Sequence, residues 1–338
     1  MFMFKIYLSS LNALFFFFLI MGLTLASSSS SWFGMWTGLE LNLLSFIPLI
    51  MSSNTRYSSE AALKYFLIQA LGSSLIIFAS SMLLFSSQLF SIILTMALLL
   101  KLGSAPFHFW FPQIMEGLLW PQAAILMTFQ KIAPLFMLSY LIDMYNISHI
   151  LMMSIILSAV VGAIGGINQL SLRKIMAFSS INHMAWMITA SMMSDILMML
   201  YFIFYFIITT SIVMIFHFMQ TFHFNHIYNN NNTTPSMKFI SFLSLLSLGG
   251  LPPFTGFFPK WILIQEMNNY KLYFILFVLL LSALVTLYYY LRLSLSSYNL
   301  SSLKLKSNIL TEKKTLYTPI FISLNLFGLI LPISFLVF

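Results

Sequence analysis

The sequence predicts an all-α membrane protein that crosses the bilayer about eleven times. Of its 338 residues, 60% are hydrophobic and only 7% are charged, whereas about a quarter of the residues in a soluble domain are charged. Runs of roughly twenty apolar residues recur along the whole chain, and each is long enough for a helix to cross a hydrocarbon core of ~30 Å. Lipid, rather than water, is therefore the expected solvent of this chain.

Hydropathy and helix-breaking residues divide the chain into eleven predicted spans. They are residues 4–27, 32–51, 61–85, 90–116, 121–141, 149–167, 171–193, 196–222, 238–266, 271–296 and 316–337. Most connections are too short to hold a folded domain, so we predict a single transmembrane domain over residues 1–338. Its parts are two halves, 1–145 and 146–296, and a linker with a last helix, 297–338. The first span could instead be a secretory signal, but ten further spans follow it and favour a membrane helix.

The basic residues near the ends of the spans and between them test this count independently. Of these residues, only Lys271 falls on the side of the membrane opposite the N terminus. The others are Lys5, Arg56, Lys64, Arg173, Lys174, Lys238, Arg292, Lys304, Lys306, Lys313 and Lys314, and all fall on the N-terminal side. The positive-inside rule therefore predicts the N terminus in the matrix or cytoplasm and the C terminus in the opposite compartment.

Composition excludes several kinds of site. The formal net charge of +8 could indicate nucleic-acid binding, but the basic residues lie between apolar spans and form no recognition helix or stacking platform. The chain has no cysteine, which excludes disulfides, thiolate metal sites and iron–sulfur ligation within it. The histidines lack metal-ligand spacing, and no stretch resembles a nucleotide loop, a flavin site or a nucleophile with its base. We therefore expect no cofactor or metal in this chain and no nucleic-acid partner.

Four ionisable residues remain inside the predicted spans. Lys101, Lys131 and Lys260 lie near the middle of their spans, and Glu40 lies about eight residues into the second span. An ionised side chain at that depth costs roughly 2.5–3.5 kcal/mol on insertion scales. Snorkelling to the interface suits residues near helix ends, and a static ion pair could account for Glu40 and one lysine but not for the other two. The pattern therefore favours a functional proton path.

Glycine and proline interrupt two of the spans. The pattern Gly-x-x-Pro-Phe-x-x-x-Phe-Pro occupies residues 103–112 and recurs at residues 250–259, with every position offset by 147. Proline removes a helix hydrogen bond, and in lipid the freed groups are tolerated only where protein or a water-filled cavity satisfies them. Each break could be an ordinary proline kink. Because the two breaks match and lie five spans apart, in helices of opposite direction, they instead predict an inverted repeat with paired broken helices, as in transporters.

Six stretches, in order along the chain, resemble the antiporter-like membrane subunits of mitochondrial NADH–ubiquinone oxidoreductase, respiratory complex I. They are GLELNLLSFIPL (38–49), SSEAALKYFLIQALGS (58–73), LLLKLGSAPFHFWFP (98–112), QKIAPL (130–135), GAIGGINQLSLRKIMAFSSINHMAWM (162–187) and LSLGGLPPFTGFFPKW (246–261). The family's fold implies two inverted five-helix bundles, each with a discontinuous helix, and an eleventh helix outside them. Its usual form has fourteen helices, so this chain is expected to lack the first three. That difference argues for a subunit held within a larger membrane arm.

The resemblance also assigns roles to the buried ionisable residues. It implies that Glu40 pairs with Lys101, that Lys131 is a connecting lysine on the next helix, and that Lys260 is the terminal group on the second broken helix. His183 is a further candidate, as a relay between the two halves, although a helix–helix hydrogen bond accounts for it about as well. These five residues form the predicted proton path.

The resemblance implies proton translocation across the inner mitochondrial membrane, coupled to NADH oxidation and ubiquinone reduction by the whole complex. Flavin, iron–sulfur clusters and ubiquinone sites are then expected in other subunits. Expected neighbours are other membrane-arm subunits, with chains 4, 4L and 6 beside this one, together with supernumerary subunits and membrane lipids. In that setting the N terminus faces the matrix and the C terminus faces the intermembrane space. Two rival functions stay open, a stand-alone cation/proton antiporter and a membrane scaffold without transport.

Overall fold

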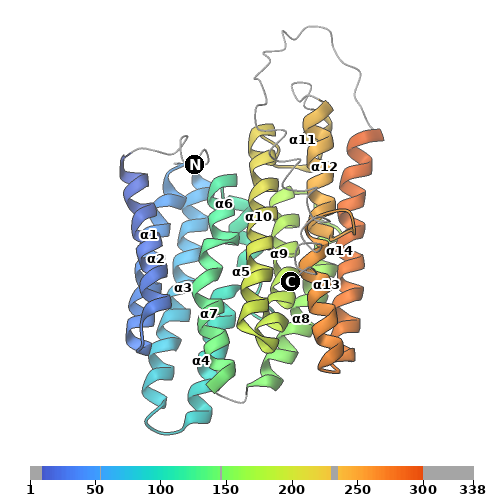
Figure 1. The fold of residues 1–338 in the computed structure, drawn as a ribbon. Coiled ribbons are helices and arrows are strands. Elements are labelled where there is room, and N and C mark those ends of the chain that lie inside the picture. Colours follow the sequence, from blue (N-terminus) through green and yellow to red (C-terminus); the bar gives the residue numbers. More distant parts are fainter. Residues whose placement is uncertain (1–9, 54, 145–146, 230–234, 300–338) are drawn as a thin grey trace. The chain divides into compact units, whose positions relative to one another are not determined.

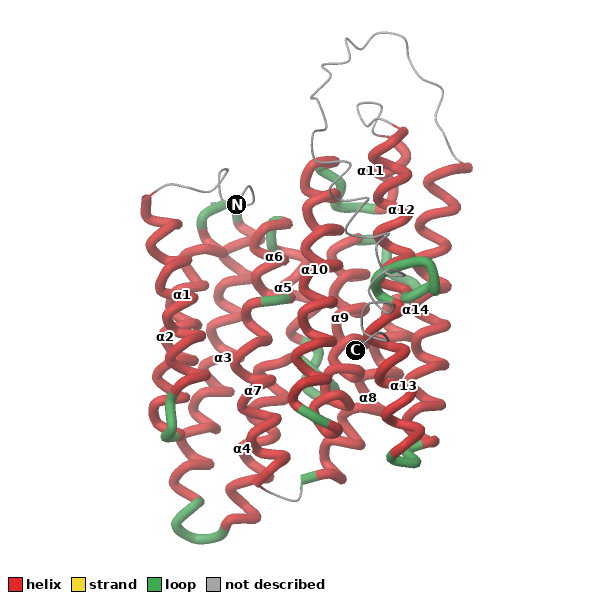
Figure 2. Tube along the Cα trace, in the orientation of Figure 1, coloured by secondary structure: helices red, strands yellow, loops and turns green. Residues whose placement is uncertain are grey.

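The computed structural model describes residues 10–53, 55–144, 147–229 and 235–299. Within these residues the regular structure is helical, with one isolated antiparallel bridge between Ser171 and His223 and no strand (Figures 1 and 2). The predicted all-α class is therefore confirmed. Packing divides the chain into two compact units, residues 1–158 and residues 159–338.

The first unit is built from helices that pack side by side. They are α1 (Ser10–Ser28), α2 (Trp32–Met51), α3 (Arg56–Met82), α4 (Ser87–Leu102), α5 (Trp110–Gly117), α6 (Trp120–Met127), α7 (Phe129–Met144) and the first part of α8 (Ser148–Gly166). α2 packs against α1 and α3, and α4 packs against α3 and α7. α3 and α4 therefore pack against each other and against other helices of this unit.

The second unit contains the end of α8 and the helices that follow it. These helices are α9 (Leu172–Met193), α10 (Asp195–Met219), α11 (Phe224–Asn229), α12 (Pro235–Gly249), α13 (Phe257–Asn269) and α14 (Tyr273–Asn299). α10 packs against α9 and α12, and α14 packs against α12 and α9. In this unit every residue of α9 from Ser179 to Ser191 is buried.

Ten of the eleven predicted spans coincide with a helix or with two successive helices, and the eleventh, 316–337, lies outside the described residues. Seven helical segments in the described residues are long and apolar enough to cross a membrane. They are Ser10–Ser28, Trp32–Met51, Arg56–Met82, Trp120–Ile142, Ser148–Gly166, Asp195–Met219 and Tyr273–Leu295. The apolar helices Ser87–Leu102 and Met237–Gly249 are shorter, because each belongs to a broken span. The structure thus supports a multi-pass membrane protein, while the count of eleven crossings and the proposed halves stay predictions.

α3 begins at Arg56, five residues before the predicted start of its span, because a capping box starts the helix there. The Ser58 N–H donates to Thr55 Oγ1 at 3.3 Å, and the Thr55 N–H donates to Ser58 Oγ at 3.2 Å. These bonds satisfy N–H groups that a helix N-terminus otherwise leaves free. Hydropathy misplaced this start because the capped first turn is polar.

Both predicted interruptions are observed, and they have the same length. Residues 103–109 separate α4 from α5, and residues 250–256 separate α12 from α13, with an offset of 147 at each end. The first residue of each break is a glycine with positive φ, 70° at Gly103 and 79° at Gly250. Glycine adopts this left-handed conformation without the Cβ strain that other residues meet, and it lets the backbone cap the last carbonyls of the helix.

Two irregularities were not predicted. The predicted span 121–141 is divided at Thr128, whose Oγ1 donates to the Ala124 carbonyl at 2.6 Å. The Lys131 N–H then bonds to the Thr128 carbonyl three residues back, in place of the four-residue helical pattern. The short helix α11 lies between the predicted spans 196–222 and 238–266, where no helix was predicted. The first irregularity matters because it directly precedes a predicted site lysine.

Candidate functional site

The three lysines predicted to lie inside the membrane are all buried. Lys101, Lys131 and Lys260 are 6%, 2% and 7% exposed, and Glu40 on α2 is partly buried. Burial removes a lysine from water, so hydrogen-bond acceptors, aromatic faces or carboxylates must take the place of water around its charged form. The groups around each lysine therefore decide what it can do.

Lys101 lies in the last turn of α4 and extends along α3. A Cβ atom added at Gly72 of α3 would lie 2.9 Å from Lys101 Cγ and 3.2 Å from Lys101 Cε. The glycine therefore leaves the room that the lysine stem occupies. Three residues earlier on α3, Gln69 Nε2 donates to the Lys101 carbonyl at 3.4 Å. α3 thus holds both the main chain and the side chain of Lys101.

Side chains also cap the carbonyl groups at the first break. The Trp110 indole N–H, from α5, donates to the Leu100 carbonyl at 3.0 Å, and Gln69 donates to the next carbonyl along the chain. These are among the last carbonyls of α4, which have no partner within the helix. Protein groups therefore satisfy the broken helix, as lipid requires.

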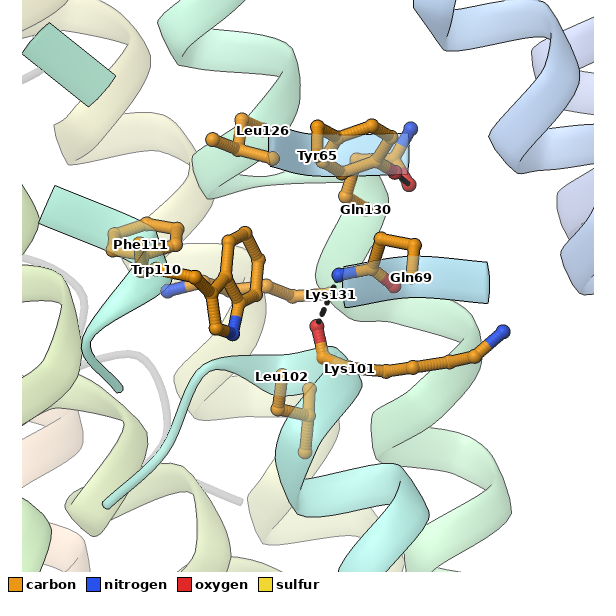
Figure 3. Close-up of a pocket in the computed structure, with 9 residues that line it drawn as sticks. All are labelled: Tyr65, Gln69, Lys101, Leu102, Trp110, Phe111, Leu126, Gln130 and Lys131. Atoms are coloured by element: carbon orange, nitrogen blue, oxygen red, sulfur yellow. Dashed lines mark hydrogen bonds between the residues drawn. The ribbon is translucent and has the colours of Figure 1, made fainter. Parts of the chain in front are cut away.

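A small pocket lies beside the first break, within the first unit (Figure 3). It is lined by Tyr65, Gln69, Lys101, Leu102, Trp110, Phe111, Leu126, Gln130 and Lys131. The space left for the centre of a water molecule is about 10 Å³, roughly what one water needs. Lys101 and Lys131 both line it, but Figure 3 shows their side chains extending in opposite directions. The fold thus brings two predicted site residues to one pocket without joining their ammonium groups.

Lys131 faces an aromatic ring. Its Nζ lies 5.0 Å from the centroid of the Phe111 ring, within the range of a cation–π interaction. Phe111 belongs to the repeated Gly–Pro–Phe pattern and lies in α5, so the helix after the first break supplies a group that attracts the charged form of Lys131.

Glu40 acts on Lys101 through space. The two residues interact electrostatically, but no direct ion pair joins them in the part of the chain that the structure describes. The pairing that the family resemblance implies is therefore seen here as a longer-range interaction.

A row of polar side chains links α2, α7 and α3, and the sequence analysis missed it. Tyr65 Oη donates to Gln130 Oε1 at 3.0 Å, and Gln130 Nε2 donates to Asn42 Oδ1 at 3.0 Å. Tyr65 and Gln130 line the pocket, so this row runs from the pocket to the helix that carries Glu40. A signal was available in the sequence, because Asn42 follows Glu40 by two residues and Gln130 directly precedes Lys131.

Lys260 lies in the first turn of α13 and closes the second break. Its ammonium group donates to the Gly249 carbonyl at 2.9 Å and to the Leu248 carbonyl at 3.4 Å, which are the last carbonyls of α12. A Cβ atom added at Gly250 would lie 3.0 Å from Lys260 Cδ. In the second unit a lysine therefore caps the broken helix, where an indole and an amide do so in the first.

His183 is buried in α9 and contacts α10. Its Nδ1 lies 2.9 Å from the Tyr201 hydroxyl, so the helix–helix hydrogen bond considered from the sequence is present. A relay role stays a prediction, and such a bond is compatible with it. Trp186, on the next turn of α9, has its ring stacked parallel to Tyr201, and Lys260 Nζ lies 5.9 Å from the Trp186 ring centroid. The second unit therefore connects His183 with Lys260 through two aromatic rings.

The predicted site residues are thus divided between the units. Glu40, Lys101 and Lys131 lie in the first unit, and His183 and Lys260 lie in the second. In each unit the ionisable residues are near an interrupted helix and near polar side chains that the sequence analysis did not single out.

Comparisons with known proteins show what this arrangement is similar to. The transmembrane family described as NADH:quinone oxidoreductase/Mrp antiporter, TM, matches residues 29–286. NADH-ubiquinone oxidoreductase chain 2 of Anopheles gambiae is 47% identical over 334 residues, covering 95% of this chain and 96% of the relative. The protein of the same name from Aedes aegypti is 45% identical over 299 residues, covering 86% of each.

A solved structure has the same fold at lower identity. A chain of respiratory complex I from Thermus thermophilus with bound Aureothin superposes with a TM-score of 0.83 at 23% identity, covering 96% of this chain and 79% of that one. The fold, the family match and the two insect relatives lead to one conclusion. This chain belongs to the NADH:quinone oxidoreductase/Mrp antiporter family of membrane proteins, among its NADH-ubiquinone oxidoreductase chain 2 members.

Proposed function

We propose that this chain is a proton-translocating, antiporter-like subunit in the membrane arm of respiratory complex I. The observation that carries the proposal is that three lysines are buried beside interrupted or irregular helices in a chain of this family. A buried lysine that alternates between its charged and neutral forms can carry a proton, and ionisable residues inside a membrane generally mark such paths.

Small movements between helices can change the charge of Lys101. For two unit charges ~4 Å apart, at an effective dielectric constant of about 20, the attraction is roughly 4 kcal/mol, and doubling the separation halves it. Glu40 acts on Lys101 without a direct ion pair, so their attraction can still strengthen or weaken as α2 shifts relative to α4. Strengthening favours the protonated lysine and weakening favours its release of the proton.

The pocket beside the first break supports transfer from Lys101 to Lys131. Their ammonium groups point apart, so a proton moves between them through water and polar side chains rather than directly. The pocket has space for about one water molecule, and the Tyr65 hydroxyl and the Gln130 amide line it. Lys260 and His183 serve the same path in the second unit.

The energy for this transport comes from other subunits. NADH oxidation and ubiquinone reduction drive the movement, and flavin, iron–sulfur clusters and the ubiquinone site belong to those subunits. The chain spans the inner mitochondrial membrane with its N terminus in the matrix and its C terminus in the intermembrane space. Its neighbours are chains 4, 4L and 6 of the same complex, supernumerary subunits and membrane lipids.

Two measurements test this function. On a native gel the chain should co-migrate with an NADH-oxidising assembly of many subunits. In vesicles that contain this assembly, neutral replacement of Glu40, Lys101, Lys131 and Lys260 together should abolish the chain's proton movement. Normal pumping by that variant would support a membrane scaffold instead, and proton-for-sodium exchange by the purified chain in liposomes would support a stand-alone antiporter.

A further inference from the structure

A cluster of buried tyrosines surrounds His183 in the second unit. Tyr201 and Tyr205 come from α10, and Tyr289 and Tyr290 come from α14; we refer to His183 and these four residues as the tyrosine cluster. Each of the four tyrosines is at most 2% exposed. None of the four tyrosines was part of the predicted proton path.

The side chains of the tyrosine cluster lie close to one another in space. His183 Nδ1 lies 2.9 Å from the Tyr201 hydroxyl, and the His183 and Tyr205 rings are 5.2 Å apart between centroids. Tyr290 is close enough to Tyr201 and Tyr205 to interact with both electrostatically. The rings of Tyr289 and Tyr290 meet edge to face, with centroids 4.7 Å apart. His183 and the four tyrosines therefore lie together within the second unit.

One end of the tyrosine cluster reaches the lysine of the second break. The Tyr201 ring stacks on the Trp186 ring, with an interplanar angle of 4°. Lys260 Nζ lies 5.9 Å from the centroid of that same Trp186 ring. A single indole therefore separates Tyr201 from Lys260.

The other end lies near the side of the membrane where α8 ends and α9 begins. Ser282 of α14 donates to Asn182 Oδ1 of α9 at 3.0 Å, so these two residues lie at the same level. Tyr289 is seven residues further along α14, which is about 10 Å of helix rise. A Cβ atom added at Gly166, the last residue of α8, would lie 2.7 Å from Tyr289 Cε1. Tyr289 is thus on the same side of the unit as the basic residue Arg173, near the start of α9.

Buried polar atoms outside standard hydrogen-bond geometry lie at both ends of the tyrosine cluster. Within the residues that the structure describes, they are the indole N–H of Trp186 and the hydroxyls of Tyr289 and Tyr290. The Tyr290 hydroxyl nevertheless lies near Ser179 and near the Tyr289 hydroxyl. Buried polar groups are nearly always bonded to protein or to ordered water. A water-assisted route would take up water at these three positions.

A packing role explains the tyrosine cluster less well. The chain contains 36 phenylalanines, and phenylalanine would fill the same space without leaving a buried hydroxyl to satisfy. Tyrosine adds only a group that both donates and accepts a hydrogen bond. That property is needed for carrying protons and not for packing.

We propose that the tyrosine cluster is a water-assisted route that carries protons from the membrane side where α9 begins to Lys260. This inference rests on the proposed function, in which Lys260 takes up and releases a proton. Each hydroxyl or imidazole accepts a proton from one neighbour and gives one to the next, so every transfer breaks one O–H or N–H bond and forms another. At the outer end the proton comes from water, and at the inner end it converts the neutral Lys260 amine to the ammonium.

Hydroxyl deletions in the assembled complex test this route. Tyr201→Phe and Tyr290→Phe keep the rings and remove only the hydroxyls, so they should assemble normally. The number of protons moved per NADH oxidised should fall to that of the Lys260→Arg variant. The control is Tyr288→Phe on the same helix, where the side chain is 57% exposed, and this variant should pump normally. If both cluster variants pump normally while Lys260→Arg is impaired, the proposed route is wrong but the proposed function stands. If Lys260→Arg itself pumps normally, both the route and the proposed function are wrong.

Labelling gives a second, independent test. Because the chain has no native cysteine, Tyr290→Cys in the assembled complex can be treated with a small, water-soluble thiol reagent and this chain then analysed by mass. The cysteine should be labelled from the membrane side where α9 begins and not from the opposite side. Tyr288→Cys, on the exposed surface of α14, is the matched control and should stay unlabelled, since we expect this surface to face lipid or a neighbouring subunit. Labelling of position 290 from the opposite side, or from neither, overturns the route.

Discussion

At the scale of single residues, each buried lysine is held by a different kind of group. Lys101 lies against α3 at Gly72, Lys131 lies over the Phe111 ring, and Lys260 donates to two main-chain carbonyls. Carbonyl oxygens stabilise an ammonium group by charge-assisted hydrogen bonds, and the face of an aromatic ring attracts it through the ring quadrupole. The three lysines therefore have chemically different surroundings.

If Lys101 is a proton carrier, its charge must be both present and removable. Lys101→Ala should abolish proton movement while leaving the assembled complex largely intact. Lys101→Arg should be nearly as damaging, because arginine keeps its proton at any physiological pH. Glu40→Gln should have an intermediate effect, since it weakens the attraction on Lys101 without removing the carrier. The measurement is proton pumping per NADH oxidised in reconstituted membranes, with assembly checked on native gels.

An exposed lysine provides the control for Lys101. Lys64 forms an ion pair with Glu60 at 2.7 Å, with side chains 42% and 57% exposed, and such surface pairs contribute little. Lys64→Ala should therefore pump normally. A structural ion pair at Lys101 predicts a different pattern, in which arginine substitutes well and alanine causes misassembly. Normal pumping by Lys101→Arg would remove Lys101 from the path.

Gly72 is predicted to determine where the Lys101 side chain lies. In Gly72→Ala, the new Cβ would meet the lysine stem 2.9 Å away, so the side chain must move away from α3. Alanine favours the helix over glycine by roughly 0.5–1 kcal/mol, so assembly should be retained while pumping falls. Ser74→Ala, on an exposed position two residues further along α3, is the control and should pump normally. Unchanged pumping by Gly72→Ala would show that the position of the Lys101 stem does not matter.

At the scale of helices, the two breaks share backbone geometry but differ in how they are capped. Both begin at a glycine with positive φ and have the same length. In the first unit Trp110 and Gln69 cap the freed carbonyls, and in the second Lys260 does so. The matching offset continues to predict that spans one to five superpose on spans six to ten after an in-plane two-fold rotation, which a structure of the assembled complex would check.

Lys260 is predicted to have a structural and a transport role that can be separated. Lys260→Arg keeps donors for the two carbonyls but cannot release a proton, so the complex should assemble and its pumping should fail. Lys260→Met loses the donors as well, and leaving buried carbonyls unsatisfied costs roughly 1–3 kcal/mol, so its assembly on native gels should also be reduced. Equal assembly of the two variants would show that the lysine does not hold the break.

At the scale of the whole molecule, the distribution of basic residues and the order of the helices predict the orientation in the membrane. Positive charge on the N-terminal side predicts, by the positive-inside rule, that this side faces the matrix. Ser59, near the start of α3, and Asp195, at the start of α10, are exposed positions predicted to face opposite compartments.

The orientation can be measured by labelling. Because the chain has no cysteine, single cysteines in Ser59→Cys and Asp195→Cys can be treated with a reagent that does not cross the membrane. In intact inner-membrane vesicles each should react from one side only, and the two sides should differ. Reaction of both positions from the same side would show that the predicted topology is wrong.

The sequence by itself determined the helical membrane class, the two breaks and the residues that carry charge into the membrane. Each of these depends on local chemistry. Apolar runs predict spans, glycine with proline predicts an interrupted helix, and a lysine within an apolar run is visible wherever the chain folds. The family resemblance added the roles of Glu40, Lys101, Lys131, Lys260 and His183, which remain to be tested by mutation.

Only the tertiary structure decided what surrounds those charges. Three contacts each join two different helices. Lys101 packs against Gly72, Lys260 caps α12, and His183 contacts Tyr201. No local pattern encodes such contacts, because they depend on which faces of two helices meet. The same reason explains why the tyrosine cluster could not be recognised in the sequence: a tyrosine in an apolar span is unremarkable until a second helix places other polar groups beside its hydroxyl.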